Sequence, residues 1–331
     1  MTVFIFIIIV IALGFNFLNG MNDAANSIAT VVSTKVLSPL QGVAWAALWN
    51  FAAYFLFGVP VATVIGKGIV NPEIVTANIV FSALLGSILW TAICTWVGLP
   101  ISVSHALIGG LIGPAILIGG AKYLVISGIL KVVLFIVLSP LLGLVLGNLL
   151  MIGTMWVFRK TSPRKVDSTF RILQLASSAV FSLGHGSNDA QKTMGIIAIL
   201  LFSTGNMVGE FHIPIWVILT CYGTISLGTL LGGWKVIKTL GTSLTHLKPV
   251  QGFCAETAGA LTVIGSTLFG IPVSTTHTIT GSIMGVGMVK NLRAVRWGVA
   301  GNIVLAWILT IPASMIFSGG IYLLSNLISG N

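Results

Sequence analysis

Two short stretches place a carboxylate inside apolar sequence. Asp23 lies in GMNDAAN, residues 20–26, and is the only charged residue between Thr2 and Thr34. Asp189 lies in the similar stretch GSNDAQK, residues 186–192. A charged side chain at the centre of a bilayer costs roughly 2.5 to 3.5 kcal/mol on insertion scales, so two such aspartates require a shared physical reason.

Neutral amide oxygens flank both carboxylates, on Asn22, Asn26, Asn188 and Gln191. Hard oxygen ligands around one negative charge suit a small alkali cation, or a proton on the carboxylate. We therefore expect sodium ligands at Asp23, Asn22, Asn26, Asp189 and Asn188. The alternative is structural: the asparagines cap broken helices, and Asp189 pairs with Lys192, three residues further on.

A second pair of motifs offers the opposite chemistry. GLPISVSH, residues 98–105, and GIPVSTTH, residues 270–277, each follow a glycine and proline with a cluster of hydroxyls. A helix that starts there points free N–H groups and its positive dipole end at a bound anion, which predicts a site for a tetrahedral oxyanion. The expected phosphate ligands are Ser102, Ser104, Ser274, Thr275 and Thr276, with Asn22, Asn188 and Lys192. The alternative is that these hydroxyls are ordinary N-caps.

Other ionisable residues have less defined roles. His105 and His277 occupy matching positions after the hydroxyl clusters, either as interior histidines or in a proton-linked role. His185 stands where the first motif has Asn19, and Glu256 is either a gate or a solvated helix end.

Composition identifies the elements that must position these residues. The 331 residues are 56% hydrophobic and 7% charged, with a mean hydropathy of +1.07, which predicts a multi-pass protein of the plasma (inner) membrane, surrounded by lipid. The absence of polar and apolar alternation favours an all-α fold over a barrel. Net charge is +10, but the basic residues lie in short connections without interleaved aromatics, so no nucleic acid partner is expected. The charge-free stretches are Val36 to Gly66, Ile74 to Ala121, Val132 to Phe158, Phe211 to Trp234, Thr257 to Val289 and Trp297 to Asn331.

The chain reads as an internal duplication. Both motifs recur in the same order, with Pro100 following Asp23 by 77 residues and Pro272 following Asp189 by 83. The polar stretch RKTSPRKVDSTFR separates the copies. We predict a first repeat over residues 1–158, a cytoplasmic basic linker over 159–171 and a second repeat over 172–331.

Basic residues predict that the two repeats have opposite orientations. By the positive-inside rule, four basic connections are cytoplasmic, and those with Lys67 and Lys122 are outside, as are both termini. The cytoplasmic connections are those at Lys35, Arg159 to Arg171, Lys235 to Lys248, and Lys290 to Arg296. Within each repeat, residues such as 74–97 and 102–121 either both cross the membrane or form a re-entrant hairpin. We favour the hairpin, because it brings the helix-breaking motif to mid-depth beside the aspartates.

These duplicated motifs resemble those of the inorganic phosphate transporter family, the PiT permeases, whose signature is G-x-N-D-x-x-N in both halves. The resemblance covers essentially the whole chain. It implies ion-driven phosphate uptake by an inverted-repeat transporter that is often a homodimer. Lys192 stands where the first copy has Asn26, a form similar to that of bacterial members.

The predicted function is therefore symport of inorganic phosphate with a cation, sodium favoured over proton, by a protein that is not an enzyme and uses no cofactor. One alternative is a sulfate permease of the same family. Another is an intramembrane aspartyl protease, in which two membrane aspartates form a catalytic dyad. The sequence opposes the protease, since it lacks GxGD and surrounds each aspartate with amides.

Overall fold

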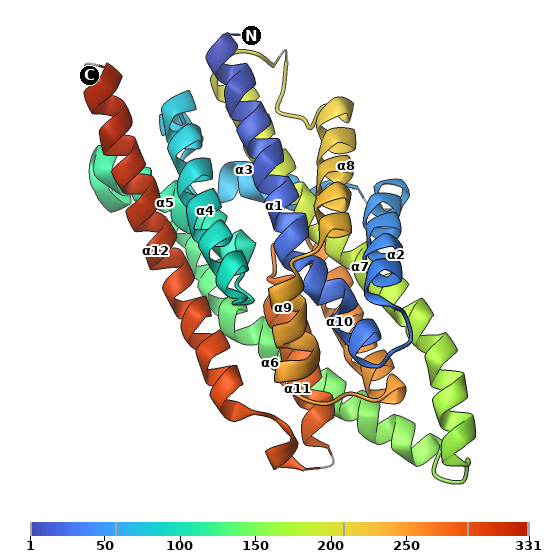
Figure 1. Ribbon diagram of the computed structural model, residues 1–331. Coiled ribbons are helices and arrows are strands. Elements are labelled where there is room, and N and C mark those ends of the chain that lie inside the picture. The colour runs from blue at the N-terminus through green and yellow to red at the C-terminus, as the bar shows by residue number, and fades with distance from the viewer. Residues whose placement is uncertain (1, 57, 208, 290, 330–331) are drawn as a thin grey trace.

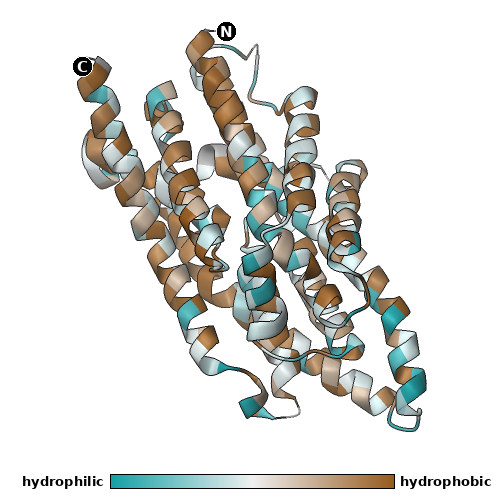
Figure 2. Ribbon diagram, viewed as in Figure 1, coloured by the Kyte–Doolittle hydropathy of each residue, from teal (hydrophilic) through white to brown (hydrophobic). Residues whose placement is uncertain are grey.

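The computed structural model describes residues 2–56, 58–207, 209–289 and 291–329, and these form helices and short connections without a strand. Lys290 and the last two residues of the predicted second repeat lie outside the described residues. Among those described, five helices are long and apolar enough to cross a membrane, or six if a pair bent by 66° counts as one span. The predicted all-helical membrane fold is confirmed. Figure 2 shows hydrophobic residues along these long helices and hydrophilic ones at the connections at one end.

The helices fall into two corresponding sets. Those of the first half are α1 (Val3–Ser33), α2 (Pro39–Ala52), α3 (Pro60–Gly68), α4 (Ala77–Val97), α5 (Val103–Gly119) and α6 (Ile126–Val157). Those of the second are α7 (Pro163–Ser203), α8 (Ile215–Leu231), α9 (Trp234–Lys238), α10 (Pro249–Leu268), α11 (Thr275–Met288) and α12 (Trp297–Ser329). In Figure 1, α1 and α7 run in opposite directions, as do α6 and α12. This arrangement is compatible with inverted repeats, which we include in the proposal below.

The two halves interlock rather than pack as separate units. Helix α1 packs on α8, while its counterpart α7 packs on α2; likewise α12 packs on α4 and α5, while α6 packs on α10 and α11. Small residues allow these close approaches, because a Cβ at Gly109 would lie 2.5 Å from the Ile311 carbonyl oxygen. Gly281, the equivalent of Gly109, meets the carbonyl of Pro140 in the same way.

The helices that carry the aspartates are continuous. Asp23 lies within α1 and Asp189 lies within α7, and each helix continues without a break through its own motif. The idea that the motif asparagines cap broken helices is therefore wrong. Their side chains bond instead to neighbouring helices, and the chain breaks elsewhere, between α8 and α9 and at the turns after α4 and α10.

Each proline motif forms the turn of a helical hairpin inside the molecule. Helix α4 ends at Val97 and is capped by Gly98, whose positive φ of 82° suits a residue without a side chain, and α5 begins after Ser102. Gly270 takes the same left-handed conformation, with φ 68°, before α11. Residues 100–103 and 273–275 are buried, so both turns are interior, as the re-entrant arrangement requires. Figure 1 shows α4 entering from the end of the molecule opposite to α10.

Contacts among the connections agree with the predicted sides. The Arg171 side chain bonds to the Lys35 carbonyl (2.5 Å), and Thr245 bonds to the Ala294 carbonyl, which joins connections that were predicted to share the cytoplasmic side. At the other end, Asn71 N–H bonds to the Tyr123 carbonyl. Figure 1 shows the start of α1 and the end of α12 at this second end.

The predicted linker is largely helical. Helix α7 begins at Pro163 and has 41 residues, so it is about 60 Å long, roughly twice the hydrocarbon thickness of a bilayer. Its first turns carry the exposed Arg164 and Lys165. The proposed boundary after residue 171 thus falls inside α7 rather than between elements.

The arrangement predicts which substituted cysteines a membrane-impermeant thiol reagent reaches from outside. Cysteine in place of Lys122 should label in intact cells, whereas cysteine in place of Lys165 or Lys238 should label only after permeabilisation, because those positions lie at the opposite end. The native Cys94, Cys221 and Cys254 are buried and give a low background. Labelling of positions 122 and 238 from the same side would contradict the topology.

Candidate functional site

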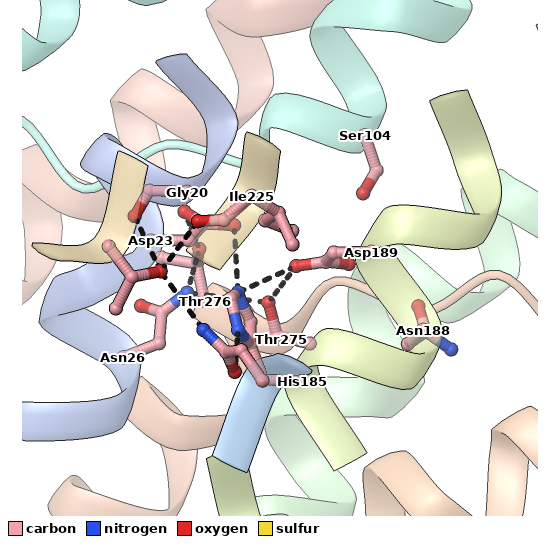
Figure 3. A network of polar contacts seen from close by, with 12 residues as sticks. Gly20, Asp23, Asn26, Ser104, His185, Asn188, Asp189, Ile225, Thr275 and Thr276 are labelled. Atoms are coloured by element: carbon pink, nitrogen blue, oxygen red, sulfur yellow. Dashed lines mark hydrogen bonds and ion pairs between the residues drawn. The ribbon is translucent and has the colours of Figure 1, made fainter. Parts of the chain in front are cut away.

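A buried polar cluster lies where α1 and α7 meet the two hairpin turns. Asp23 is 3% exposed, Asp189 1% and Lys192 2%. Each comes from a continuous helix, while the hydroxyls beside them come from the starts of α5 and α11. Figure 3 shows Asp23, Asn26, His185, Asp189, Thr275 and Thr276 converging, with Asn188 apart from them. The structure therefore joins the residues predicted for the cation with several of those predicted for the anion.

On the first-half side, Asp23 shares a hydroxyl with Asn26. Thr276 donates a hydrogen bond from Oγ1 to Asp23 Oδ1 (3.2 Å) and accepts one from Asn26 Nδ2 (2.9 Å). Asn26 Nδ2 also reaches Thr275 Oγ1 (3.3 Å). A first-half helix thus holds the hydroxyls of the second-half hairpin.

On the second-half side, Lys192 binds Asp189 directly, as the structural alternative predicted. Its ammonium Nζ forms an ion pair with Asp189 Oδ1 and donates to Ser104 Oγ (2.5 Å) and to the Val273 carbonyl (2.9 Å). Asp189 Oδ2 accepts from Thr275 Oγ1 (2.9 Å). The Lys192–Ser104 contact is the repeat equivalent of Asn26–Thr276, so both halves reach across in the same way.

His185 lies between the two carboxylates. Its Nε2 is 3.0 Å from Asp189 Oδ2 and 3.9 Å from Asp23 Oδ2. Thr229 donates to the Ile225 carbonyl, so its oxygen must accept from Asn50 Nδ2, and this turns Asn50 Oδ1 towards His185 Nδ1 (3.1 Å). Nδ1 therefore carries a proton. Nε2 then either carries the second proton of an imidazolium or offers a lone pair to a cation held by the carboxylates.

Asn22 and Asn188 are held by threonines that the sequence interpretation overlooked. Asn22 Nδ2 donates to Thr95 Oγ1 (2.7 Å), and Asn188 Nδ2 donates to Thr267 Oγ1 (2.8 Å). Both threonines lie five residues before the motif proline, so the repeat spacing contained the signal. Asn50, which orients His185, had no comparable signal because it lies outside both motifs.

Several amide oxygens on the two motif helices are buried without a hydrogen-bond partner among the described residues. They are Oδ1 of Asn19, Asn22, Asn26 and Asn188. In addition, one ligand atom each from Asp23, His185 and Asp189 lie within 4.8 Å of one another. Buried oxygens without a donor are destabilising unless they meet a cation or water, so this donor set fits a hard cation.

The hydroxyls predicted for phosphate divide into two groups. Ser102 and Ser274 are N-caps, since each accepts a bond from the backbone N–H of His105 or His277, as the structural alternative held. Ser104, Thr275 and Thr276 instead bond to the side chains described above. The first N–H groups of α5 and α11 have no intrahelical acceptor and lie beside these hydroxyls. Their use by an anion stays a prediction.

The remaining interior residues contact side chains of neighbouring helices. His105 and His277 contact each other edge to face, with ring centroids 4.9 Å apart, and His277 stacks on Trp307 at 3.8 Å. This packing ties the two hairpins together just behind their turns. Glu256 is fully buried and accepts hydrogen bonds from Thr30, Gln174 and Ser177, so the solvated helix end is wrong.

An all-helical membrane fold with two buried carboxylates is compatible with a transporter or an intramembrane enzyme, and similarity to known proteins decides between them. The family model of phosphate transporters matches residues 19–318, and the chain belongs to this family. It is therefore a multi-pass plasma membrane transporter and not an enzyme, which removes the aspartyl protease alternative.

Relatives resemble the chain along nearly its whole length. A probable low-affinity inorganic phosphate transporter of Rhizobium meliloti is 54% identical, with 97% of this chain and 96% of the relative covered. A protein of the same description from Bacillus subtilis is 39% identical, with 97% of each chain covered. A solved structure, the sodium-dependent phosphate transporter, superposes with a TM-score of 0.90 at 27% identity, covering 99% of this chain and 100% of that one.

The threonines that hold the motif asparagines provide a test of this geometry. Thr95→Val should lower the free energy of unfolding by about 1 kcal/mol, because it leaves the buried Asn22 amide without its acceptor. Thr95→Ser keeps the hydroxyl and should be close to wild type. Thermal unfolding of the detergent-purified proteins measures both. Equal stability of the valine and serine variants would show that Asn22 does not depend on this contact.

Proposed function

We propose that this protein imports inorganic phosphate by symport with a cation, sodium favoured over proton, through two inverted repeats that share one central site. Membership of the phosphate transporter family supports the substrate. The likeness to a sodium-dependent phosphate transporter over 99% of the chain supports sodium. No cofactor is indicated, and sodium is a transported ion in this mechanism.

The cation side of the proposal rests on the surroundings of Asp23. Among the described residues, this carboxylate accepts a hydrogen bond from Thr276. Its own helix also carries the amide oxygens of Asn19, Asn22 and Asn26, which have no partner in that part of the chain. These positions share one helix face with Asp23, because residues three and four apart lie side by side. One charge with neutral oxygens is the ligand set of a hard monovalent cation.

The anion side rests on the two helix starts. The N-termini of α5 and α11 come from opposite halves, and both lie beside the aspartates through Ser104, Thr275 and Thr276. Orphan N–H groups and hydroxyl donors at two helix N-termini suit a phosphate between them. Asn22, Asn188 and Lys192, also predicted for the anion, have their nitrogens bonded to protein oxygens in this conformation.

The observation that carries the proposal is the hydrogen bond from Thr276 to Asp23. A hydroxyl can donate one hydrogen bond, and here Thr276 donates it to Asp23. A cation on Asp23 satisfies the carboxylate and accepts a lone pair of the hydroxyl oxygen, which leaves the hydroxyl proton free for phosphate. Cation and phosphate therefore favour each other, both through this hydroxyl and through direct attraction of opposite charges in a low dielectric.

Access to the site would alternate between the two hairpins. A pocket of about 320 Å3 reaches the second turn at Gly270, Ile271 and Pro272 from the side of α3 and α6, with Lys131 in its wall. At the first turn, Thr239 of the segment after α9 bonds to the Gly98 carbonyl (2.8 Å) and covers it. In this conformation the approach is thus more open from the end predicted to be outside.

Sulfate is the second candidate substrate, because it is also a tetrahedral oxyanion and would satisfy the same donors. The family description and the relatives favour phosphate. Competition of unlabelled sulfate against labelled phosphate uptake distinguishes them, and stronger inhibition by sulfate than by phosphate would reverse the assignment.

The coupling ion can be assigned with purified protein in liposomes. We expect an inward sodium gradient at equal pH to drive accumulation of labelled phosphate above its equilibrium level, and a proton gradient without sodium to do so less effectively. Liposomes without protein are the control. Accumulation driven by protons alone would assign the proton, and mere equilibration under both gradients would indicate a channel.

The role of Asp23 can be tested by removing only its charge. Asp23→Asn should lower cation affinity and, by reciprocal linkage, phosphate affinity by the same factor. Asp167→Asn is the matched control, because Asp167 is exposed at the start of α7. If folded Asp23→Asn protein keeps the wild-type dependence of phosphate uptake on sodium and on pH, the driving ion binds elsewhere.

The shared hydroxyl can be tested by an isosteric change. Thr276→Val keeps the shape and removes a donor to a charged acceptor, worth roughly 1.5 to 3 kcal/mol, so phosphate affinity should fall about tenfold or more. Thr276→Ser should stay near wild type, and Ser104→Ala should weaken binding similarly. Phosphate binding at saturating sodium is the measurement. Unchanged affinity in both Thr276→Val and Ser104→Ala would show that these hydroxyls serve only the protein.

A further inference from the structure

We propose that the Lys192 ammonium is a tethered cation that permanently fills the second of two repeat-related cation sites, so that each phosphate needs one mobile cation, at Asp23, instead of two. This inference rests on the proposed symport. The difference between Asn26 in the first half and Lys192 in the second would then set the number of cations transported with each phosphate.

The first support is the environment of the ammonium. Lys192 Nζ lies among a carboxylate oxygen of Asp189, the hydroxyl oxygen of Ser104 and the carbonyl oxygen of Val273. An ammonium has three N–H donors and no acceptor, so these three oxygens use all of them. Carboxylate, hydroxyl and carbonyl oxygens are also what a hard cation coordinates. The side chain therefore puts a positive charge where an ion would otherwise bind.

The second support is the equivalent place in the other half. Asp23 corresponds to Asp189, and Thr276 corresponds to Ser104. In the first-half site, Thr276 Oγ1 donates a hydrogen bond of 3.2 Å to Asp23 Oδ1. Where the second half has Lys192, the first has Asn26, which is neutral and leaves its Oδ1 without a partner. The carboxylate and the hydroxyl of this arrangement are thus present in the first half, with a neutral amide in place of the fixed charge.

The third support is the pattern of side chains along the two motif helices. On α1 the residues around Asp23 are Asn19, Asn22 and Asn26, each with a buried, unpartnered Oδ1. The equivalents on α7 are His185, Asn188 and Lys192. Two of three oxygen ligands are thus replaced by nitrogen groups, both of which contact Asp189. The first half can ligate a mobile cation, whereas the second has its own positive charge.

The hydroxyls respond to this difference. Ser104 Oγ accepts from the Lys192 ammonium and donates to no group among the described residues, so its proton is already available to an anion. The Thr276 hydroxyl instead donates its hydrogen bond to Asp23. In the proposed mechanism a mobile cation must bind Asp23 before the Thr276 hydroxyl can donate to phosphate. Lys192 already neutralises Asp189, so the Ser104 hydroxyl can donate to phosphate at all times. The Ser104 hydroxyl is therefore always available to phosphate, whereas the Thr276 hydroxyl becomes available only when a cation binds Asp23.

The test measures how many cations accompany each phosphate. We expect the slope of log phosphate affinity against log sodium concentration to be about one for wild-type protein and to rise to about two for Lys192→Asn, which restores the amide of the first half. Phosphate binding of Lys192→Asn should be weak at low sodium and recover at high sodium. Equilibrium binding to monodisperse purified protein is the measurement. If protons prove to be the driving ion, the same slopes are taken against pH.

Two further variants complete the design. Lys192→Met removes the charge without supplying an oxygen, so high sodium should not restore its phosphate binding. The exchange Asn26→Lys with Lys192→Asn moves the tethered cation to the first half at constant charge and should return the slope to about one. Recovery in the methionine variant, or a slope near two for the exchanged protein, would contradict a tethered cation.

The outcomes separate this inference from the symport itself. If wild-type binding depends on neither sodium nor pH, the proposed symport fails. A wild-type slope near two would overturn the role of Lys192 without any variant and leave symport intact. If Lys192→Asn loses affinity equally at all sodium concentrations, Lys192 acts as a phosphate ligand instead.

Discussion

Two carboxylates buried close together in the protein interior are the constraint on which this structure depends. Oxygens of Asp23 and Asp189 lie within 4.8 Å of each other, both nearly inaccessible to solvent. If both are ionised, their repulsion is about 3 to 4 kcal/mol at an effective dielectric of 20, besides the cost of removing each from water. Positive charge must offset this. Lys192 supplies it for Asp189, and a transported cation would supply it for Asp23.

The fold brings these groups together because each half contains the same pair of elements, a continuous motif helix and a hairpin with an interior turn. A membrane-spanning helix can present a carboxylate at mid-depth without breaking, but it cannot present free N–H groups there. The hairpins supply these, because their turns end one helix and begin another inside the molecule. Since each motif helix bonds to the hairpin of the other half, through Asn26 and Lys192, movement of one half would alter both ligand sets together.

Much of this could be predicted from the sequence, because burial of charge and helix breaks are local signals. The aspartates, the hydroxyl clusters and the interior hairpin turns were all predicted from residue types and spacing. The continuity of α1 and α7 was not, since asparagines that resemble caps bond instead to Thr95 and Thr267 on other helices. The setting of His185 also depends on tertiary packing, through Asn50 of α2.

In the proposed mechanism, cation and phosphate bind to one coupled site. The most direct measurement is a reciprocal pair of titrations on wild-type protein: phosphate affinity across a range of sodium concentrations, and sodium affinity across a range of phosphate concentrations. Each ligand should strengthen binding of the other by the same factor, because linkage is reciprocal. Phosphate affinity that is independent of both sodium and pH would contradict it.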